Sequence, residues 1–64
     1  MSNVSVKIAT DNAAFRLEDG TLDRFEVARV MREAADKVEA GYSTGRLMDA
    51  NGNDVGGFLV TEDS

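Results

Sequence analysis

Residues 23–41, DRFEVARVMREAADKVEAG, carry the strongest structural signal in this chain. Their apolar residues recur at i, i+4, i+7 and i+11, which is the spacing of one face of an α-helix. Glu33 and Lys37 stand four residues apart as a favourable ion pair on the remaining surface. The stretch therefore predicts an amphipathic helix with a core-facing stripe of Val27, Met31, Ala34 and Val38, widened by Val30 and Ala35.

Both ends of this helix carry recognisable capping signals. Asp23 with Glu26 three residues later has the outline of a capping box, and Thr21 is the competing N-cap. Gly41 suits a left-handed C-terminal cap. Phe25 lies off the apolar stripe, so it either covers the preceding loop or is exposed for a partner.

A strand is predicted before the helix, over residues 3–10. Val4, Val6 and Ile8 alternate with polar residues or alanine, the period of a half-buried strand. Asp and Asn at 11 and 12 favour a turn. Residues 11–21 are then a loop, which Phe15 is expected to anchor on the core.

A hairpin is predicted after the helix, from strands 46–49 and 55–60. Asn51-Gly52 between them favours a type I′ turn, in which both central residues have positive φ. Gly56-Gly57 inside a strand indicates a bulge or the close approach of another backbone. The polar tail 61–64 is expected to fray.

These elements predict one small α+β domain over residues 1–64, in the order β-α-β-β. One helix packs on a three-stranded antiparallel sheet of order 1-3-2: with strand 55–60 in the centre, strand 3–10 can pair antiparallel with it and all three directions are satisfied. The other sheet face stays uncovered. It is a candidate self-association surface carrying Lys7, Met48 and either Phe58 or Leu59.

The composition excludes most chemistry. The chain has no Cys and no His, so thiolate nucleophiles, zinc-thiolate sites and the usual neutral-pH base are absent. Residues 49–54 begin like a calcium loop, but position six is Asp54 instead of Gly and position twelve is Val60 instead of Glu. The pairs Glu18-Asp19 and Glu62-Asp63 lie in predicted loops without the burial that acid catalysis needs. We therefore expect no enzyme, no catalytic residues, no metal and no cofactor.

Size and charge narrow the remaining classes. Seven Lys+Arg against twelve Asp+Glu give a net charge of −5, which argues against direct nucleic-acid binding. The chain has no run of roughly 18 apolar residues and no signal peptide at its start, so a cytoplasmic protein without membrane contact is expected. A monomer or weak homodimer fits a domain this small.

The predicted topology gathers carboxylates at one end, where the first strand ends, the helix begins and the hairpin turns. Only Arg16 and Arg24 oppose them. These acidic loops either keep a small protein soluble or present a negative potential to a basic groove, as a phosphate backbone does. The predicted partner-binding residues are Asp11, Glu18, Asp19, Asp23, Glu26, Asp49 and Asp54.

Three stretches carry a resemblance: TDNAAF at 10–15, EVARVMR at 26–32 and GRLMDANGNDVG at 45–56. Over residues 4–60 the chain resembles short acidic proteins of phages and mobile elements that share a T-D-N-A-A-F start and a D-x-N-G-N-x-V-G hairpin. It also looks similar to small anti-CRISPR proteins directed at type I systems, the I-C subtype among them. The resemblance implies a partner, the Cascade surveillance complex of the bacterial host, whose access to target DNA the protein blocks.

Two functions from different classes follow. One is a non-enzymatic inhibitor that acts as an acidic DNA mimic and binds a basic DNA-binding groove on a Cascade subunit. The other is a self-associating accessory protein of a phage or mobile element, which uses the uncovered sheet face.

Overall fold

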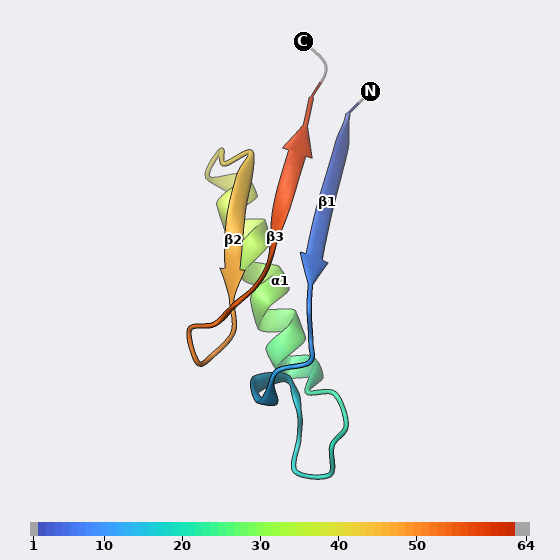
Figure 1. The fold of residues 1–64 in the computed structure, drawn as a ribbon. Coiled ribbons are helices and arrows are strands. Elements are labelled where there is room, and N and C mark those ends of the chain that lie inside the picture. Colours follow the sequence, from blue (N-terminus) through green and yellow to red (C-terminus); the bar gives the residue numbers. More distant parts are fainter. Residues whose placement is uncertain (1, 63–64) are drawn as a thin grey trace.

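The computed structural model describes residues 2–62 and has the predicted β-α-β-β order (Figure 1). Its three strands form one antiparallel sheet of order β1-β3-β2, and one long helix packs on a single face. The predicted fold class and topology are confirmed. The elements are β1 (Asn3–Ile8), the short 3-10 helix η1 (Ala13–Phe15), α1 (Arg24–Glu39), β2 (Thr44–Met48) and β3 (Asp54–Thr61).

The central strand β3 runs further than the sequence predicts. Thr61, the last residue of β3, pairs with Asn3 of β1. The prediction that the tail frays from residue 61 onward is therefore wrong at this residue. The reason is that β1 begins at Asn3 and gives Thr61 a partner. Residues 63–64 of that predicted tail lie outside the described residues. At its other end β1 stops at Ile8, two residues short of the predicted strand.

The helix caps follow the sequence signals closely. Asp23 Oδ1 accepts hydrogen bonds from the backbone N–H groups of Phe25 and Glu26 at 3.1 and 3.2 Å, so Asp23 and not Thr21 is the N-cap. At the far end Gly41 has φ +99°, and its N–H donates to the Val38 carbonyl. This is the left-handed cap that glycine was expected to make.

The core lies between α1 and the β2–β3 half of the sheet. Its buried residues are Phe15, Val30, Ala34, Leu47, Val55 and Phe58. Phe15 thus anchors the loop as predicted. The helix stripe, however, is centred on Val30 and Ala34, whereas Met31 is 54% exposed.

The displaced stripe has a physical cause in the placement of the helix. Arg29 and Lys37 each donate a 3.0 Å hydrogen bond to a carbonyl of β2, those of Met48 and Arg46. A helix about 10 Å wide covers only about two strands spaced 4.8 Å apart. Because α1 is tied toward β2, the helix side of β1 is poorly covered, and Val4 and Val6 are 63% and 45% exposed. The half-buried face predicted for this strand is therefore wrong at both valines.

A β-bulge in β3 completes the core, as the glycine pair predicted. Leu47 pairs with Gly56 and Met48 with Asp54, which leaves Val55 as the extra residue. The bulge turns Val55 into the core instead of onto the open face. The backbone also approaches closely here, since a Cβ on Gly56 would collide with the Lys7 carbonyl oxygen.

The hairpin turn differs from the predicted type I′ turn. Of its two central residues only Gly52 has positive φ, at +82°, so the type I′ prediction is wrong. Instead Gly52 N–H donates to the Asp49 carbonyl and Asp49 N–H to the Asn53 carbonyl, which closes a three-residue loop. This is the type I turn with a following left-handed glycine that such loops favour.

No helix among residues 2–62 combines the length and the apolar character that crossing a membrane requires.

Candidate functional site

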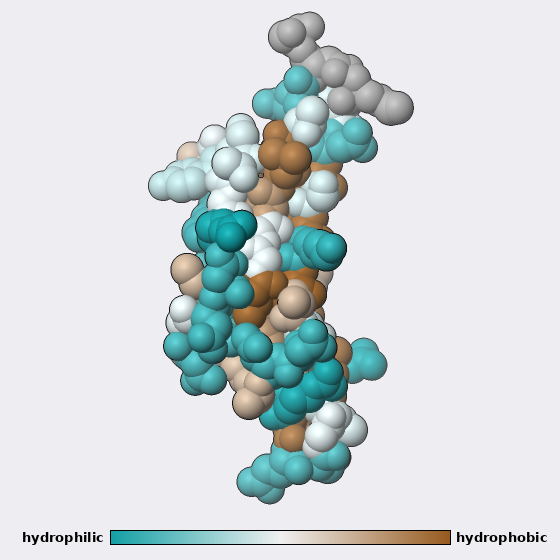
Figure 2. All heavy atoms as spheres, in the orientation of Figure 1, coloured by the Kyte–Doolittle hydropathy of each residue, from teal (hydrophilic) through white to brown (hydrophobic). Residues whose placement is uncertain are grey.

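The seven predicted carboxylates all lie on segments that meet at one end of the molecule, which we name the acidic end. There the C-terminal end of β1, the N-terminus of α1 and the β2–β3 turn lie together (Figure 1). Hydrophilic side chains cover much of the lower part of the surface in Figure 2, over these loops. The acidic end is nevertheless two chemically different sets of residues, one interior and one exposed.

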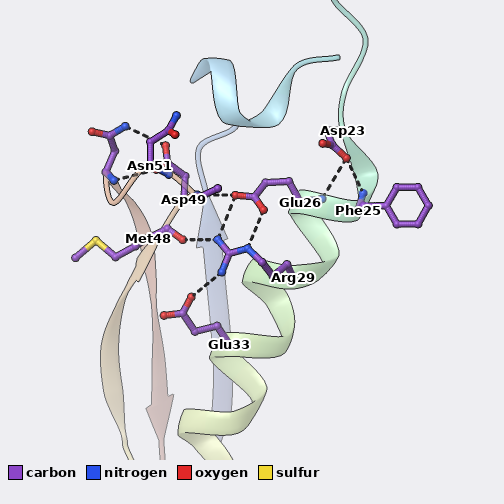
Figure 3. Close-up of polar contacts among 10 residues, drawn as sticks. Asp23, Phe25, Glu26, Arg29, Glu33, Met48, Asp49 and Asn51 are labelled. Atoms are coloured by element: carbon purple, nitrogen blue, oxygen red, sulfur yellow. Dashed lines mark hydrogen bonds and ion pairs between the residues drawn. The ribbon is translucent and has the colours of Figure 1, made fainter. Parts of the chain in front are cut away.

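Glu26 belongs to the interior set. It is only 8% exposed and sits between the helix and the hairpin turn (Figure 3). Arg29 Nε donates to Oε1 at 2.8 Å, Arg29 Nη2 to Oε2 at 3.1 Å, and the backbone N–H of Ala50 to Oε2 at 2.7 Å. The Arg29 hydrogen bond is the main reason that the pKa of Glu26 lies below its usual value, and it outweighs the opposing effect of burial. Glu26 therefore joins helix to hairpin and does not complete a capping box.

Asp49 is the second interior carboxylate, 4% exposed. Its Oδ1 accepts the backbone N–H groups of Asn51 and Asn53, both at 2.9 Å. Its Oδ2 accepts the side-chain amides of Asn12 at 3.0 Å and Asn53 at 3.2 Å. Burial pushes the pKa of Asp49 upward, but these donors together hold it below its usual value.

The surroundings of Asp49 also bear on a metal. Four N–H donors point at its two oxygens, the arrangement of a hydrogen-bonded turn and not of a cation ligand. Within residues 2–62 there is no group of three or more Asp or Glu side chains placed to hold a metal ion.

The exposed set consists of Asp11, Glu18, Asp19 and Asp54, with the capping Asp23 half-buried beside it. Asp19 accepts the backbone N–H of Thr21 at 3.0 Å and its hydroxyl at 2.6 Å, and the hydroxyl bond is the main cause of its lowered pKa. Asp54 forms a 2.9 Å ion pair with Arg46 on the sheet. Asp11, Glu18 and Asp19 are thus the exposed carboxylates of the acidic end that neither cap the helix nor form an observed ion pair.

The sequence allows Phe25 to cover the preceding loop or to be exposed, and the structure places it in solvent. Its ring is 89% exposed in the first turn of α1, and Figure 3 shows it pointing away from the hairpin. Large aromatic side chains are among the residues that carry most binding energy in protein interfaces. Phe25 adjoins the acidic end. Its position off the apolar stripe of the helix was the feature of the sequence that indicated exposure to a partner.

The uncovered sheet face differs in part from the predicted one. Leu59, Met48 and Lys7 are exposed and lie on strand positions facing away from the helix. Phe58 pairs with Val6 and Gly45 on the helix side and is buried in the core. Of the two residues predicted as alternatives for the uncovered sheet face, Leu59 therefore lies on it and Phe58 does not.

The two interior carboxylates make the stability of the fold dependent on pH. Because their folded-state pKa values are lowered, they stabilise the fold above the unfolded values of about 4, and this contribution is lost as the pH falls through the lower, folded values. We expect the melting temperature to be flat between about pH 7 and 5 and to fall below about pH 4.5. Thermal melts followed by circular dichroism from pH 7 to 2 measure this. Glu26→Gln should show a shallower acid limb, and a wild-type melting temperature that stays flat to pH 2 would contradict the assignment.

Comparison of the chain with protein-family models, with curated proteins and with solved structures finds no match.

Proposed function

We propose that this chain is a non-enzymatic inhibitor that binds a type I Cascade complex in the bacterial cytoplasm and blocks target DNA by acidic mimicry. The observation that carries the proposal is the exposed group Asp11, Glu18 and Asp19 at one end of an elongated molecule. The domain measures 47 × 19 × 16 Å, so this end is narrow enough to enter a groove. Cascade as the partner rests on the resemblance of the sequence to small type I anti-CRISPR proteins.

Electrostatics supports this mode of binding. An RNA-guided effector holds nucleic acid in a positively charged channel, by analogy with Cas9. A negative group entering such a channel competes with phosphates and gains association rate from steering. Glu26 and Asp49 are interior and Asp23 caps the helix, so the contact role falls on the exposed carboxylates. Phe25 nearby supplies an apolar anchor that phosphate mimicry alone lacks.

A phage plaque assay tests the proposal. Bacteria with active type I systems of several subtypes, expressing this protein, are challenged with a phage that each system targets. Restored plaquing in one subtype supports the inhibitor and identifies the complex. No rescue in any strain with soluble expression would overturn it.

The double variant Asp11→Lys/Glu18→Lys is expected to lose most of the rescue, because it reverses two exposed charges without removing an observed hydrogen bond or ion pair. The matched control is Asp36→Lys/Glu62→Lys, which changes net charge equally at exposed positions away from the acidic end. Full rescue by the first variant, or equal loss in both, would contradict mimicry by the acidic end. Circular dichroism melts confirm that both variants fold.

A self-associating accessory protein of a mobile element is the second candidate. Exposed Leu59 and Met48 on the uncovered sheet face favour it. It predicts no rescue of plaquing and loss of self-association in Leu59→Lys.

A further inference from the structure

Strand β1 has no neighbour on its outer edge in the part of the chain that the structure describes, since the sheet order is β1-β3-β2. It contains β-branched residues, no Pro and a single charge, Lys7. Such edges are usually blunted by charge, proline or a covering element. The backbone N–H of Ala9 donates to the Val55 carbonyl. Because hydrogen-bonded pairs alternate along an antiparallel ladder, the N–H and C=O groups of Val4, Val6 and Ile8 point toward the open edge.

An apolar groove of about 350 Å³ lies beside this edge, between β1 and the helix. It exists because α1 is tied toward β2 and leaves the valines of β1 uncovered. Its walls are almost entirely apolar, with one carboxylate at the margin: Val4, Val6, Met31, Ala34, Ala35, Val38 and Glu39.

The domain is extended and exposes more surface than a compact domain of its mass. The accessible area is 4707 Å², whereas a folded monomer of 6.9 kDa is expected to expose about 4000 Å². The radius of gyration is 13.0 Å, against about 10.7 Å for 64 residues.

We propose that a second copy of this chain occupies the edge and the groove, by antiparallel pairing of two β1 strands about a two-fold axis at Ser5. This register sets Val4 opposite Val6 of the second copy, and their outward N–H and C=O groups then form the hydrogen-bonded pairs. The four valines meet on the helix side and close both grooves into one apolar layer. The result is a six-stranded sheet with both helices on the same face.

Three features favour a second copy over a different strand. The Val-Ser-Val sequence of residues 4–6 is symmetric about Ser5, so self-pairing matches apolar with apolar. Lys7 falls opposite Asn3 of the second copy, so the only charges on the strands do not meet. Each β1 also runs toward its own acidic end, so an antiparallel dimer keeps the two acidic ends at opposite poles. The dimer is independent of the proposed inhibitor function.

Sedimentation equilibrium of the full chain at about 100 µM, where a micromolar dimer is nearly saturated, tests the assembly. We expect twice the monomer mass of 6.9 kDa for the wild type and for Leu59→Lys. Val6→Lys should halve the mass and still unfold in one cooperative thermal transition, since Val6 is already half exposed in one copy. A monomeric wild type, or a dimer lost in Leu59→Lys and kept in Val6→Lys, would overturn the proposal.

Disulfide trapping tests the register without depending on how well Val6→Lys folds. The chain has no Cys, so a single introduced thiol can pair only with its copy. Ser5→Cys would face itself at a non-hydrogen-bonded pair with Cα atoms about 4.5 Å apart, within the range for disulfides. Asn3→Cys is the control, offset from its copy by four residues, or about 13 Å. Rapid cross-linking of Ser5→Cys alone supports the register. Equal cross-linking of both variants, or none in either, would overturn it.

Discussion

Gly56→Ala is expected to remove most of the free energy of unfolding at 25 °C. The added methyl group would collide with the Lys7 backbone carbonyl, in the ladder that holds β1 to β3. Neither backbone can withdraw without breaking that ladder, and overpacking in a rigid site costs about 1–3 kcal/mol or more. A single core in a domain of this size rarely supplies more than about 3–5 kcal/mol, so most of the stability is lost.

Gly45→Ala is the matched control for this prediction. Its added Cβ would lie 2.5 Å from Cε1 of the buried Phe58 ring, so a core side chain has to repack but the backbone ladder is not touched. We expect a folded protein with a reduced midpoint in urea, measured by circular dichroism. A Gly56→Ala variant at least as stable as Gly45→Ala would show that the bulge does not fix the β1–β3 approach.

Asp49→Ala is expected to lower the melting temperature by about 10 °C or more. Truncation removes the acceptor of four N–H groups and leaves the partly buried amide of Asn12 without its partner. The hairpin turn loses the hydrogen bonds from the backbone N–H groups of Asn51 and Asn53 to the Asp49 carboxylate. The loop before η1 loses the Asn12 hydrogen bond that links it to the hairpin. Differential scanning calorimetry at pH 7 measures the change.

Asp54→Ala provides the comparison at the same hairpin. Asp54 is exposed and forms a surface ion pair with Arg46, a class of contact that contributes about 0–1 kcal/mol. A loss of about 1 kcal/mol lowers the melting temperature of a domain this small by about 4–8 °C. We therefore expect the melting temperature of Asp54→Ala to stay within a few degrees of the wild type. Similar losses in both variants would mean that Asp49 acts as an ordinary surface carboxylate.

Local signals in the sequence were sufficient for the element order and for the caps. Asp23, Gly41 and the apolar spacing of the helix act within a few residues, where propensity and capping dominate. The strand order followed from chain direction once the last strand was placed in the centre of an antiparallel sheet. Gly56-Gly57 indicated a bulge or a close backbone approach, and the structure has both.

The candidate site was less predictable, because burial of a carboxylate depends on donors far along the chain. Glu26 meets a backbone N–H 24 residues away and Asp49 meets an amide 37 residues away. Hydropathy places both residues on the surface. The concentration of Asn at positions 12, 51 and 53 was the one available hint, since Asx turns recruit such side chains. The position of the helix toward β2 and away from β1 depends on the hydrogen bonds of Arg29 and Lys37 to β2. The periodicity of apolar residues in the sequence does not predict these contacts.

The pairing of Asn3 with Thr61 has a consequence for the order in which the protein folds. The helix and the β2–β3 hairpin form from neighbouring residues, but β1 must close a loop of nearly the whole chain, and loop-closure entropy delays such contacts. In a single copy we therefore expect β1 to dock last in folding and to detach first in native-state fluctuations. At concentrations where the protein is monomeric, amide protons of β1 should exchange with solvent sooner than those of α1, although both belong to the same small domain.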